Sequence, residues 1–247
     1  MGHILIIGGS RGIGRATAER AAAQGWAVSL SYVNDAAAAQ AVLATITGAG
    51  ARGLAHRADI RDESEVIALF DAAEAGFGRL DAVVVNAGVV APSMPLAQMG
   101  ADRLRGMIET NLFGALLCAR EAARRLPRPL TEPSAALVLV SSIAAKLGAP
   151  GEYVDYAATK GALDTLTLGL AKELAAANVR VNAVRPGLID TEIHASGGRP
   201  DRAHALAPLV PMQRPGRPDE VAEAILWLCS PAASYASGAI LDIGGGR

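Results

Sequence analysis

Ile4-Leu5-Ile6-Ile7-Gly8-Gly9-Ser10-Arg11-Gly12-Ile13-Gly14, near the start of the chain, is the stretch that decides the fold. Its apolar first half predicts a buried strand, and its glycine-rich second half leads into an alanine-rich segment that predicts a helix. Backbone amides and the dipole of a helix that opens in this way bind phosphate groups well. The glycine spacing, Gly-x-x-x-Gly-x-Gly, differs from the standard Gly-x-Gly-x-x-Gly fingerprint, and no Gly-Lys-Ser/Thr of a P-loop follows. A glycine turn without a ligand is the alternative, but a pyrophosphate site is favoured so early in an alternating chain.

Apolar strand-like runs alternate with helical segments along the rest of the chain. We predict strands at 4–8, 27–32, 53–56, 82–86, 135–141, 180–185 and 240–243. We predict helices at 13–24, 35–47, 63–75, 101–126, 154–177 and 218–229. Strands that are apolar on both faces and alternate with helices indicate a parallel sheet covered on both sides. The sequence therefore predicts an α/β fold: a single doubly wound Rossmann domain over residues 1–247, with about seven parallel strands in an α/β/α arrangement.

The composition of the 247-residue chain argues against several classes of function. The chain is 51% apolar, and 24 acidic side chains nearly balance 23 basic ones, so no nucleic-acid partner is expected. No apolar run is long enough to cross a bilayer and no signal peptide is evident, so no membrane partner is expected either. The histidines lack metal-ligand spacing, which predicts no metal site. Cys118 and Cys229 lie among apolar neighbours in predicted helices, which favours buried free thiols and a soluble, cytoplasmic protein.

The end of the second predicted strand bears on the choice of cofactor. The standard fingerprint places an acidic residue there, which binds the adenosine ribose of NAD. This chain has Tyr32-Val33-Asn34 instead, and Asp35 comes late enough to cap the next helix. Arg11, in the glycine turn, could pair with the 2′-phosphate of NADP through a charge-assisted bond. The sequence therefore favours NADP; NAD becomes the choice if the strand runs one residue further and turns Asp35 to the ribose.

Polar or small residues also follow the third, fourth and fifth predicted strands. Asp59-Ile60 ends the third, where Asp59 could accept a hydrogen bond from an adenine amino group or cap the next helix. Asn86-Ala87-Gly88 ends the fourth, where the amide could brace neighbouring strands and the small residues admit a flat ring. Ser141-Ser142 ends the fifth. Asn111 interrupts an apolar helix face, and exposure to solvent is its default explanation.

Tyr156-Ala157-Ala158-Thr159-Lys160, at the start of the predicted helix 154–177, carries the strongest chemical signal. Residues four apart share one helix face, about 6 Å apart, so the phenol and the ammonium lie side by side. A free tyrosine has a pKa near 10, too high for ready proton exchange at neutral pH. A lysine charge at ~5 Å in an effective dielectric of ~20 favours the phenolate by roughly 3 kcal/mol, which lowers the pKa by about 2. The pair predicts a general acid/base, although a single Tyr-Lys spacing can arise by chance.

A long segment without an obvious pattern follows the sixth predicted strand, which ends in Arg185-Pro186-Gly187-Leu188-Ile189-Asp190-Thr191. Residues 192–217 are rich in glycine, proline and charge, and irregular loops of this length usually bind ligands or act as lids. We predict that residues 188–217, called the lid segment below, cover the substrate. The arginines Arg199, Arg202 and Arg214 could meet an anionic group, but a solvated loop surface is their favoured explanation.

Together these motifs resemble the classical short-chain dehydrogenase/reductase family over essentially the whole chain. The matching positions are Gly8, Gly12, Ile13, Gly14, Asp59, Asn86, Ala87, Gly88, Asn111, Ser142, Tyr156, Lys160, Pro186, Gly187, Ile189 and Thr191. Each motif is weak alone, but their order and spacing make a strong signal. The chain is most similar to the branch of 3-oxoacyl-[acyl-carrier-protein] reductases and glucose-1-dehydrogenase-like proteins.

Two features depart from the family pattern. Ile7 stands where members usually have a threonine, whose hydroxyl braces the glycine turn. The spacing from Ser142 to Tyr156 is one residue longer than in many members. Ser141 is therefore the alternative to Ser142, which we choose because the second serine holds that place in the family pattern.

The resemblance implies an enzyme that transfers hydride between NADP(H) and a carbonyl or secondary alcohol. It assigns proton donation to Tyr156, a lowered tyrosine pKa and binding of the nicotinamide ribose to Lys160, stabilisation of the carbonyl oxygen to Ser142, and positioning of a water molecule to Asn111. A glucose-type sugar dehydrogenase using NAD(P) and a nucleotide-sensing protein without turnover are the alternatives.

The resemblance and the residues argued above also predict the cofactor contacts and the assembly. The expected contacts are Gly8, Ser10, Arg11, Gly12, Ile13, Gly14, Asn34, Asp59, Ile60, Asn86, Ala87, Gly88, Tyr156, Lys160, Pro186, Gly187, Ile189 and Thr191. A homotetramer is implied by the tail 235–245 and by the small residues Ala158, Gly161, Ala162, Thr165 and Gly169 on the Tyr156 helix. The alternative is that these small residues pack only against the protein's own sheet.

Overall fold

Seven parallel strands form one sheet in the computed structural model, which describes residues 2–247. The strands are β1 (His3–Ile7), β2 (Ala27–Tyr32), β3 (Gly53–Arg57), β4 (Ala82–Val85), β5 (Ala135–Val140), β6 (Val179–Pro186) and β7 (Ile240–Ile243). In space their order is β3-β2-β1-β4-β5-β6-β7, so the direction of winding reverses between β1 and β4. The predicted Rossmann-type fold is confirmed, and ligands of such sheets bind beyond the strand ends at this reversal.

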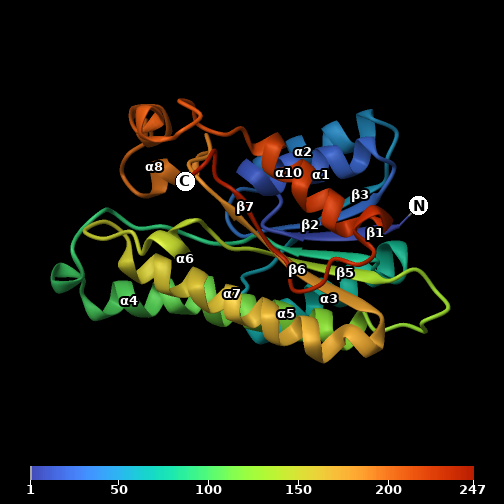
Figure 1. The fold of residues 1–247 in the computed structure, drawn as a ribbon. Helices are drawn as coiled ribbons and strands as arrows, with labels where there is room; N and C mark the ends of the chain where they lie inside the picture. Colours follow the sequence, from blue (N-terminus) through green and yellow to red (C-terminus); the bar gives the residue numbers. More distant parts are fainter. Residues whose placement is uncertain (1) are drawn as a thin grey trace.

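Helices cover both faces of the sheet (Figure 1). α1 (Gly12–Ala23), α2 (Ala36–Gly48) and α10 (Pro218–Cys229) lie on one face; α3 (Glu63–Phe77), α4 (Ala101–Ile108), α5 (Ala115–Arg125) and α7 (Val154–Leu174) lie on the other. Successive residues of β5 enter the two cores: Leu137 and Leu139 belong to the α3–α5–α7 side, Ala136 and Val138 to the α1–α10 side. Both faces of the strand are buried, which explains its unbroken apolar sequence.

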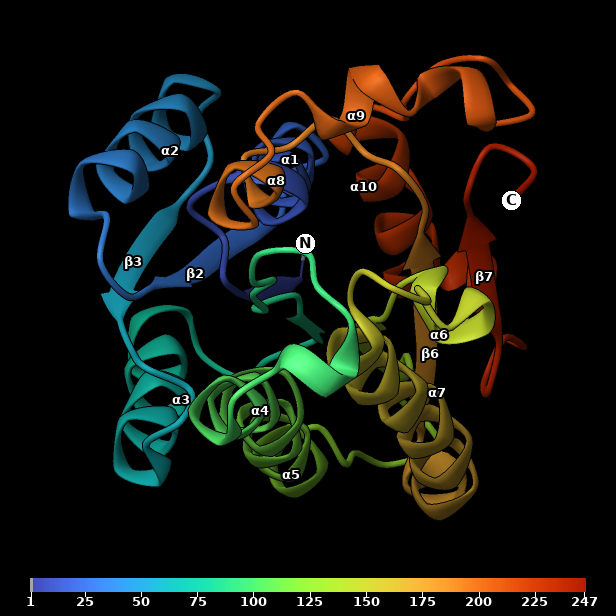
Figure 2. The same cartoon turned by 90° about the vertical axis from the view of Figure 1, so that its left-hand side faces the viewer.

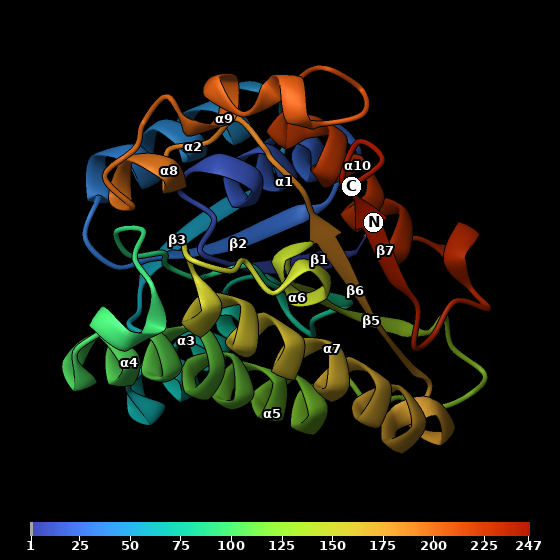
Figure 3. The ribbon, with the colours of Figure 1, turned by 60° about the vertical axis from the view of Figure 1, so that its left-hand side comes forward.

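The segment predicted as one helix, 101–126, consists of three consecutive pieces. α4 continues into a π-helical turn, Glu109–Gly114, and then into α5. π-Helical turns are rare and occur frequently at functional sites. Asn111 lies in this turn and is fully buried, so the default expectation of an exposed asparagine is wrong. Figure 3 shows α4 and α5 running beside α7 below the sheet.

The lid segment is partly helical rather than irregular. It contains α8 (Ile193–Ser196), α9 (Arg202–Ala205) and a 3-10 turn (Ala207–Leu209). Figure 2 shows α8 and α9 above the strand ends, on the same side of the sheet as α1 and α10. A single helical turn that the sequence did not predict, α6 (Ala144–Leu147), follows β5. Further 3-10 turns lie at Leu96–Gln98, Ala175–Ala177 and Pro231–Ala233.

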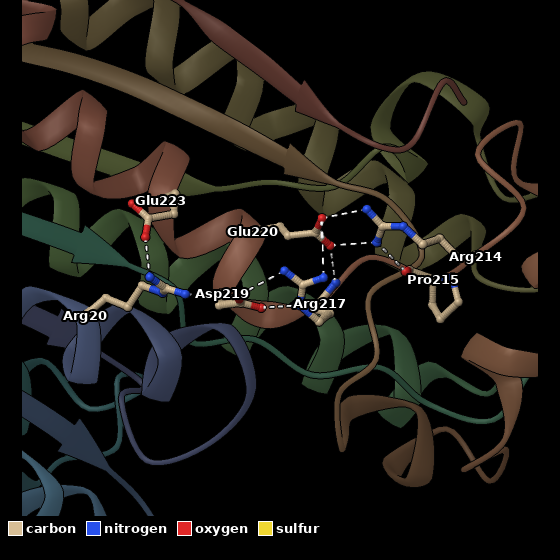
Figure 4. A network of polar contacts seen from close by, with 7 residues as sticks. All are labelled: Arg20, Arg214, Pro215, Arg217, Asp219, Glu220 and Glu223. Atoms are coloured by element: carbon tan, nitrogen blue, oxygen red, sulfur yellow. Dashed lines mark hydrogen bonds and ion pairs between the residues drawn. The ribbon is translucent and has the colours of Figure 1, made fainter.

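Ion pairs anchor the far end of the lid segment to the start of α10 (Figure 4). Arg214 donates two hydrogen bonds to Glu220, at 2.8 and 2.6 Å, and these bonds help to lower the pKa of Glu220 to about 2. Arg217 pairs with Asp219, which also accepts a hydrogen bond from Arg20 of α1. The end of the lid segment is thus fixed to α10, which is itself bonded to α1. No helix within residues 2–247 is long and apolar enough to span a membrane.

Candidate active site

The glycine turn after β1 is shaped by close backbone contacts. Gly8 has a φ of +81°, which favours glycine, and a Cβ on Gly14 would lie 2.1 Å from the Gly8 carbonyl oxygen. On β2, the Ser31 hydroxyl accepts a hydrogen bond from Gly8 N at 3.0 Å, and the Ser31 carbonyl accepts one from Gly9 N at 2.9 Å. A hydroxyl therefore braces the turn although Ile7 supplies none. It comes from another strand, so the turn's own sequence gave no sign of it.

A cavity of about 410 Å³ opens at this turn, where α1 begins. Most of the predicted cofactor residues line it: Gly8, Ser10, Arg11, Gly12, Ile13, Asn34, Asp59, Ile60, Asn86, Ala87, Gly88 and Thr191. Gly14 does not line it, because it packs inside the turn. The prediction missed Ser31, Arg61, Thr110 and Glu192, which also line the cavity. Arg11 is the N-cap of α1 but makes no side-chain cap, so the first amides of the helix keep the capacity to bind a phosphate group.

Two acidic residues that line this cavity, Asp35 and Asp59, accept hydrogen bonds from other groups of the protein. β2 ends at Tyr32, and Asp35 caps α2 by accepting a hydrogen bond from Ala38 N at 2.8 Å, as predicted. Asp59 accepts hydrogen bonds from Arg61 Nε at 2.9 and 3.0 Å, and Arg61 lowers the pKa of Asp59. The alternative role of Asp59 as a helix cap is wrong, since Asp62 caps α3.

The segment after β4 contacts both the glycine turn and the side chains of Lys160 and Asn111. Asn86 Nδ2 donates to the Gly8 carbonyl oxygen at 2.8 Å, which confirms that this amide braces neighbouring strands. A Cβ on Gly88 would lie 3.5 Å from Lys160 Nζ and 3.3 Å from Asn111 Oδ1. Gly88, three residues after β4, therefore leaves room for Lys160 and Asn111 to approach from α7 and the π-helical turn, and a longer side chain would fill that space.

Tyr156, Lys160 and Ser142 meet in a second cavity of about 280 Å³. Both cavities are lined by Ile13, Asn86, Gly88, Thr191 and Ile193, so they adjoin. Pro186, Gly187 and Ile189, also predicted to contact the cofactor, line the second one. Its apolar walls are formed by Val90, Ile143, Leu147, Pro150, Leu188 and Ile193, and the polar residues Glu152, His194, Arg202 and Arg247 also line it.

Hydrogen bonds distinguish the two serines after β5. Ser141 Oγ donates to the Lys160 carbonyl oxygen at 3.0 Å, which ties β5 to α7. Ser142 Oγ accepts a hydrogen bond from Ala144 N at 3.1 Å, and the hydroxyl lies close enough to Tyr156 to lower its pKa. The geometry therefore favours Ser142 over Ser141 as the hydroxyl beside the phenol.

Burial dominates the ionisation of the Tyr156–Lys160 pair. It raises the pKa of Tyr156 above its ordinary value, and the Ser142 hydroxyl offsets only part of this. Burial also lowers the pKa of Lys160 to about 8. Lys160 Nζ lies 5.6 Å from the centre of the Tyr156 ring and donates to the Val140 carbonyl oxygen at 2.7 Å. The expected lowering of the Tyr156 pKa is thus wrong in this structure, because removal from water opposes the phenolate more strongly than the Ser142 hydroxyl supports it.

The side chain of Asn111 is occupied by the segment after β4. Its Oδ1 accepts from Val89 N and its Nδ2 donates to the Val89 carbonyl oxygen, both at 2.8 Å. Nδ2 also lies 2.9 Å from Met107 Sδ. Asn111 therefore holds the chain beside Lys160 in place, while its water-positioning role stays a prediction.

Known proteins similar to this chain belong to the family that its sequence motifs resemble. Residues 8–247 match a family model described as enoyl-(acyl carrier protein) reductase. A mutant of a Serratia marcescens short-chain dehydrogenase/reductase superposes with a TM-score of 0.91 at 34% identity, over 99% of this chain and 97% of that one. The chain belongs to the short-chain dehydrogenase/reductase family. It is therefore an oxidoreductase that uses a nicotinamide cofactor and acts on small molecules.

Several relatives within the family match almost from end to end. The uncharacterized oxidoreductase YgfF of Escherichia coli (strain K12) is 47% identical over 100% of both chains. The cis-4-hydroxycyclohexanecarboxylate dehydrogenase of Sinomonas cyclohexanicum is 42% identical over 98% of this chain and 94% of its own. The 3-ketoacyl-(acyl-carrier-protein) reductase of Brucella melitensis, solved with NADH, has a TM-score of 0.91 at 32% identity, over 100% and 98% of the two chains. The predicted resemblance to this branch is confirmed.

Proposed function

We propose that the protein is an NADP(H)-dependent oxidoreductase that interconverts a carbonyl and a secondary alcohol, with Tyr156 as general acid/base. The observation that carries this proposal is the meeting of Tyr156, Ser142 and Lys160 in a cavity that adjoins the glycine-turn cavity. A nucleotide-sensing protein without turnover would need the glycine-turn cavity but not the Tyr156, Ser142 and Lys160 side chains.

The residues fit a dinucleotide, and each has a separate task. When bound, the nicotinamide supplies or accepts the hydride. The free amides at the start of α1 hold the pyrophosphate, and Lys160 holds the nicotinamide ribose. Tyr156 donates its phenolic proton to the carbonyl oxygen, and its raised pKa keeps that proton in place at neutral pH. Ser142 donates a hydrogen bond to the same oxygen, where negative charge develops.

The charges around the adenosine end support NADP rather than NAD. Arg11 lines the cleft and is exposed, which leaves its guanidinium accessible to a 2′-phosphate. Asp35 also lines the cleft, but its carboxylate is held by the cap of α2. The condition that would have favoured NAD, a longer β2, is not met.

The proposal extends to organisation and surroundings. The chain is one Rossmann domain over residues 1–247, with the lid segment closing over the substrate; Gly197 of the lid packs near Val90 and Ala91. Four copies assemble through the exposed face of α5 and α7 and through the tail. Both cysteines are free and buried, and burial raises the pKa of Cys229 to about 12, which suits the reducing cytoplasm.

The identity of the alcohol is the next choice. The relative from Sinomonas cyclohexanicum suggests ring alcohols that carry a carboxylate. Glucose-type sugars and 3-oxoacyl thioesters remain the alternatives from the branch. The apolar walls of the catalytic cavity favour a ring or chain of carbon over a polyhydroxylated sugar.

A cofactor-coupled screen tests the proposed function. NADPH consumption is followed over 4-oxocyclohexanecarboxylate, simple ketones, quinones and 3-oxoacyl thioesters, and NADP reduction over ring alcohols and glucose. We expect turnover with at least one carbonyl or alcohol. Tight NADPH binding without turnover on any of them would favour the nucleotide-sensing alternative.

A further inference from the structure

Arg202 differs from the other arginines of the lid segment. Its side chain is 14% exposed and lines the catalytic cavity, whereas Arg199 and Arg214 are 46% and 43% exposed and line neither cavity. The expected solvated surface therefore describes Arg199 and Arg214 but is wrong for Arg202. A guanidinium in a mostly apolar cavity needs an anionic partner, because burial of an unpaired charge is costly.

The present partner of Arg202 uses only part of its donor set. Nη2 donates to Glu152 Oε2, and the guanidinium lies 5.2 Å from the centre of the Tyr153 ring. Its Nε is buried and has no hydrogen-bond partner within residues 2–247. A buried donor without a hydrogen-bond partner destabilises the folded chain. The side chain is thus held in a fixed position over an aromatic ring with donor capacity left unused.

Glu152 is a shared rather than a dedicated partner. Its side chain is 32% exposed, and its other oxygen lies 3.6 Å from Arg199 Nη1. Arg199 can keep Glu152 if Arg202 changes partner. His194, a further polar residue of the cavity, bonds to the Ile189 carbonyl oxygen, and burial lowers its pKa, so it is neutral near pH 7. Arg202 is therefore the positive charge that the lid segment brings to the substrate.

We propose that Arg202 binds a carboxylate on the substrate, and that the substrates are oxo acids and hydroxy acids whose carboxylate is separated from the reacting carbon by an apolar body. The proposal rests on the proposed function for the position of the reacting carbon. The planar guanidinium matches two carboxylate oxygens, and the apolar walls strengthen the pairing because they exclude water. Until the acid enters, Glu152 accepts the hydrogen bond from Arg202 Nη2.

A binding experiment that needs no turnover tests the proposal. Calorimetry measures the affinity of 4-oxocyclohexanecarboxylate and of its uncharged amide, 4-oxocyclohexanecarboxamide, for the protein saturated with NADP⁺, which cannot reduce a ketone. A charge-assisted bond of ~1.5–3 kcal/mol corresponds to roughly 10- to 150-fold. We expect the wild type to bind the acid more tightly than the amide by about that factor, and Arg202→Met to remove the preference while binding the amide as before.

Three further variants separate recognition from structure. Arg199 contacts the same glutamate but does not line the cavity, so Arg199→Met should keep the preference for the acid. Arg202→Lys keeps the positive charge but not the planar guanidinium, and should retain part of the preference for the acid. Glu152→Gln removes the competing charge and should bind the acid more tightly than the wild type.

Two results would overturn the assignment: a wild type that binds the acid no better than the amide, or an Arg202→Met variant that keeps the preference or loses affinity for both ligands equally. Undetectable binding of the acid counts as the first of these. Failure of the proposed function looks different, since the screen would then show no turnover whatever the outcome of the binding experiment.

Discussion

Lys160 is the residue whose surroundings most affect the proposed chemistry. It is 3% exposed, and its pKa is lowered to about 8 by burial, while the negative charge of Asp164, one turn later on α7, raises it. Asp164 accepts a hydrogen bond from Arg185 Nε at 2.9 Å. Arg185 also donates to Asp242 of β7 at 3.3 Å. The negative charge of Asp164 therefore helps to keep Lys160 protonated.

The first prediction concerns pH. Carbonyl reduction should fall as the pH rises through about 8, because Lys160 then loses the charge that supports proton transfer from Tyr156. Asp164→Asn removes the negative charge that favours the ammonium, so the alkaline limb of kcat/KM should move to lower pH. Asp242→Asn, which removes the other carboxylate on Arg185, is the control and should leave the limb in place. An unchanged limb in Asp164→Asn would contradict the coupling.

A second residue-scale prediction concerns cofactor choice. The proposed bond between Arg11 and a 2′-phosphate would be worth ~1.5–3 kcal/mol, so Arg11→Ala should weaken NADPH binding roughly 10- to 150-fold and leave NADH binding nearly unchanged. Arg15→Ala removes a nearby arginine that pairs with Glu19, and serves as the control. Fluorescence titration with both reduced cofactors provides the measurement. Tighter binding of NADH by the wild type would show that the NADP assignment is wrong.

At the scale of elements, a buried ion pair joins α4 to the first turn of α7. Arg103 Nε donates to Asp155 Oδ2 at 2.8 Å, and the two side chains are 13% and 3% exposed. Arg103 also donates to the Pro92 carbonyl oxygen. Because Asp155 directly precedes Tyr156, this pair fixes the start of the catalytic helix against the chain after β4.

Removal of one partner should therefore be costly. Arg103→Met leaves the Asp155 carboxylate buried without its cation, so the free energy of unfolding should fall by about 3–5 kcal/mol. Arg105→Met, on the same helix, breaks a pair whose side chains are 70% and 102% exposed, and should cost less than about 1 kcal/mol. Urea unfolding measures both. Equal losses of unfolding free energy in the two variants would mean that the buried pair stabilises the fold no more than the exposed pair.

The sequence predicted long elements better than short ones, for physical reasons. Strand bounds fell within one residue because most of the strands are largely apolar runs bounded by glycine or polar side chains. The π-helical turn keeps nearly the same apolar spacing as the helices around it, so periodicity could not show it. α6 has only four residues, too few for a periodic pattern. The sequence also suggested, as an alternative role, that Asp59 caps α3, but Asp62 is closer to the helix start and takes this position.

At the scale of the whole molecule, α5 and α7 present an apolar outer face. Leu116 of α5 and Leu168 of α7 are 40% and 46% exposed, and Phe113, in the π-helical turn before α5, is 47% exposed. A Cβ on Gly161 or Gly169 would meet nothing within 4 Å, so these glycines do not pack against the sheet, which was the alternative explanation for them. Such a face allows close approach of a second copy, as the proposed tetramer requires.

Light scattering at micromolar concentration tests the assembly. We expect the mass of a tetramer for the wild type and a smaller species for Leu168→Arg, which places a charge in the middle of the face. Leu130→Arg is the control, because Leu130 is 75% exposed in the loop before β5 and lies outside this face. A monomeric wild type would exclude the homotetramer.

The proposed catalytic residues could be brought together from the sequence because most of them follow strand ends or share one helix face. Tyr156 and Lys160 needed only helical spacing, and the strand order brought Ser142 and Asn86 to the same edge. The burial of Arg202 and the brace from Ser31 depend on which segments meet in space, so no local pattern revealed them. The same holds for the raised pKa of Tyr156, which depends on how completely the surrounding segments exclude water.

The central claim is that Tyr156 donates the proton, and Tyr156→Phe tests it most directly. The substitution keeps the ring but removes the proton, so single-turnover oxidation of NADPH by the best substrate of the screen should slow by at least ~10²-fold. NADPH affinity should not change, because Lys160 and the glycine turn remain. Tyr153→Phe, a buried tyrosine of the same cavity, is the matched control and should stay close to the wild-type rate. A Tyr156→Phe variant that reduces the substrate at the wild-type rate would contradict the account.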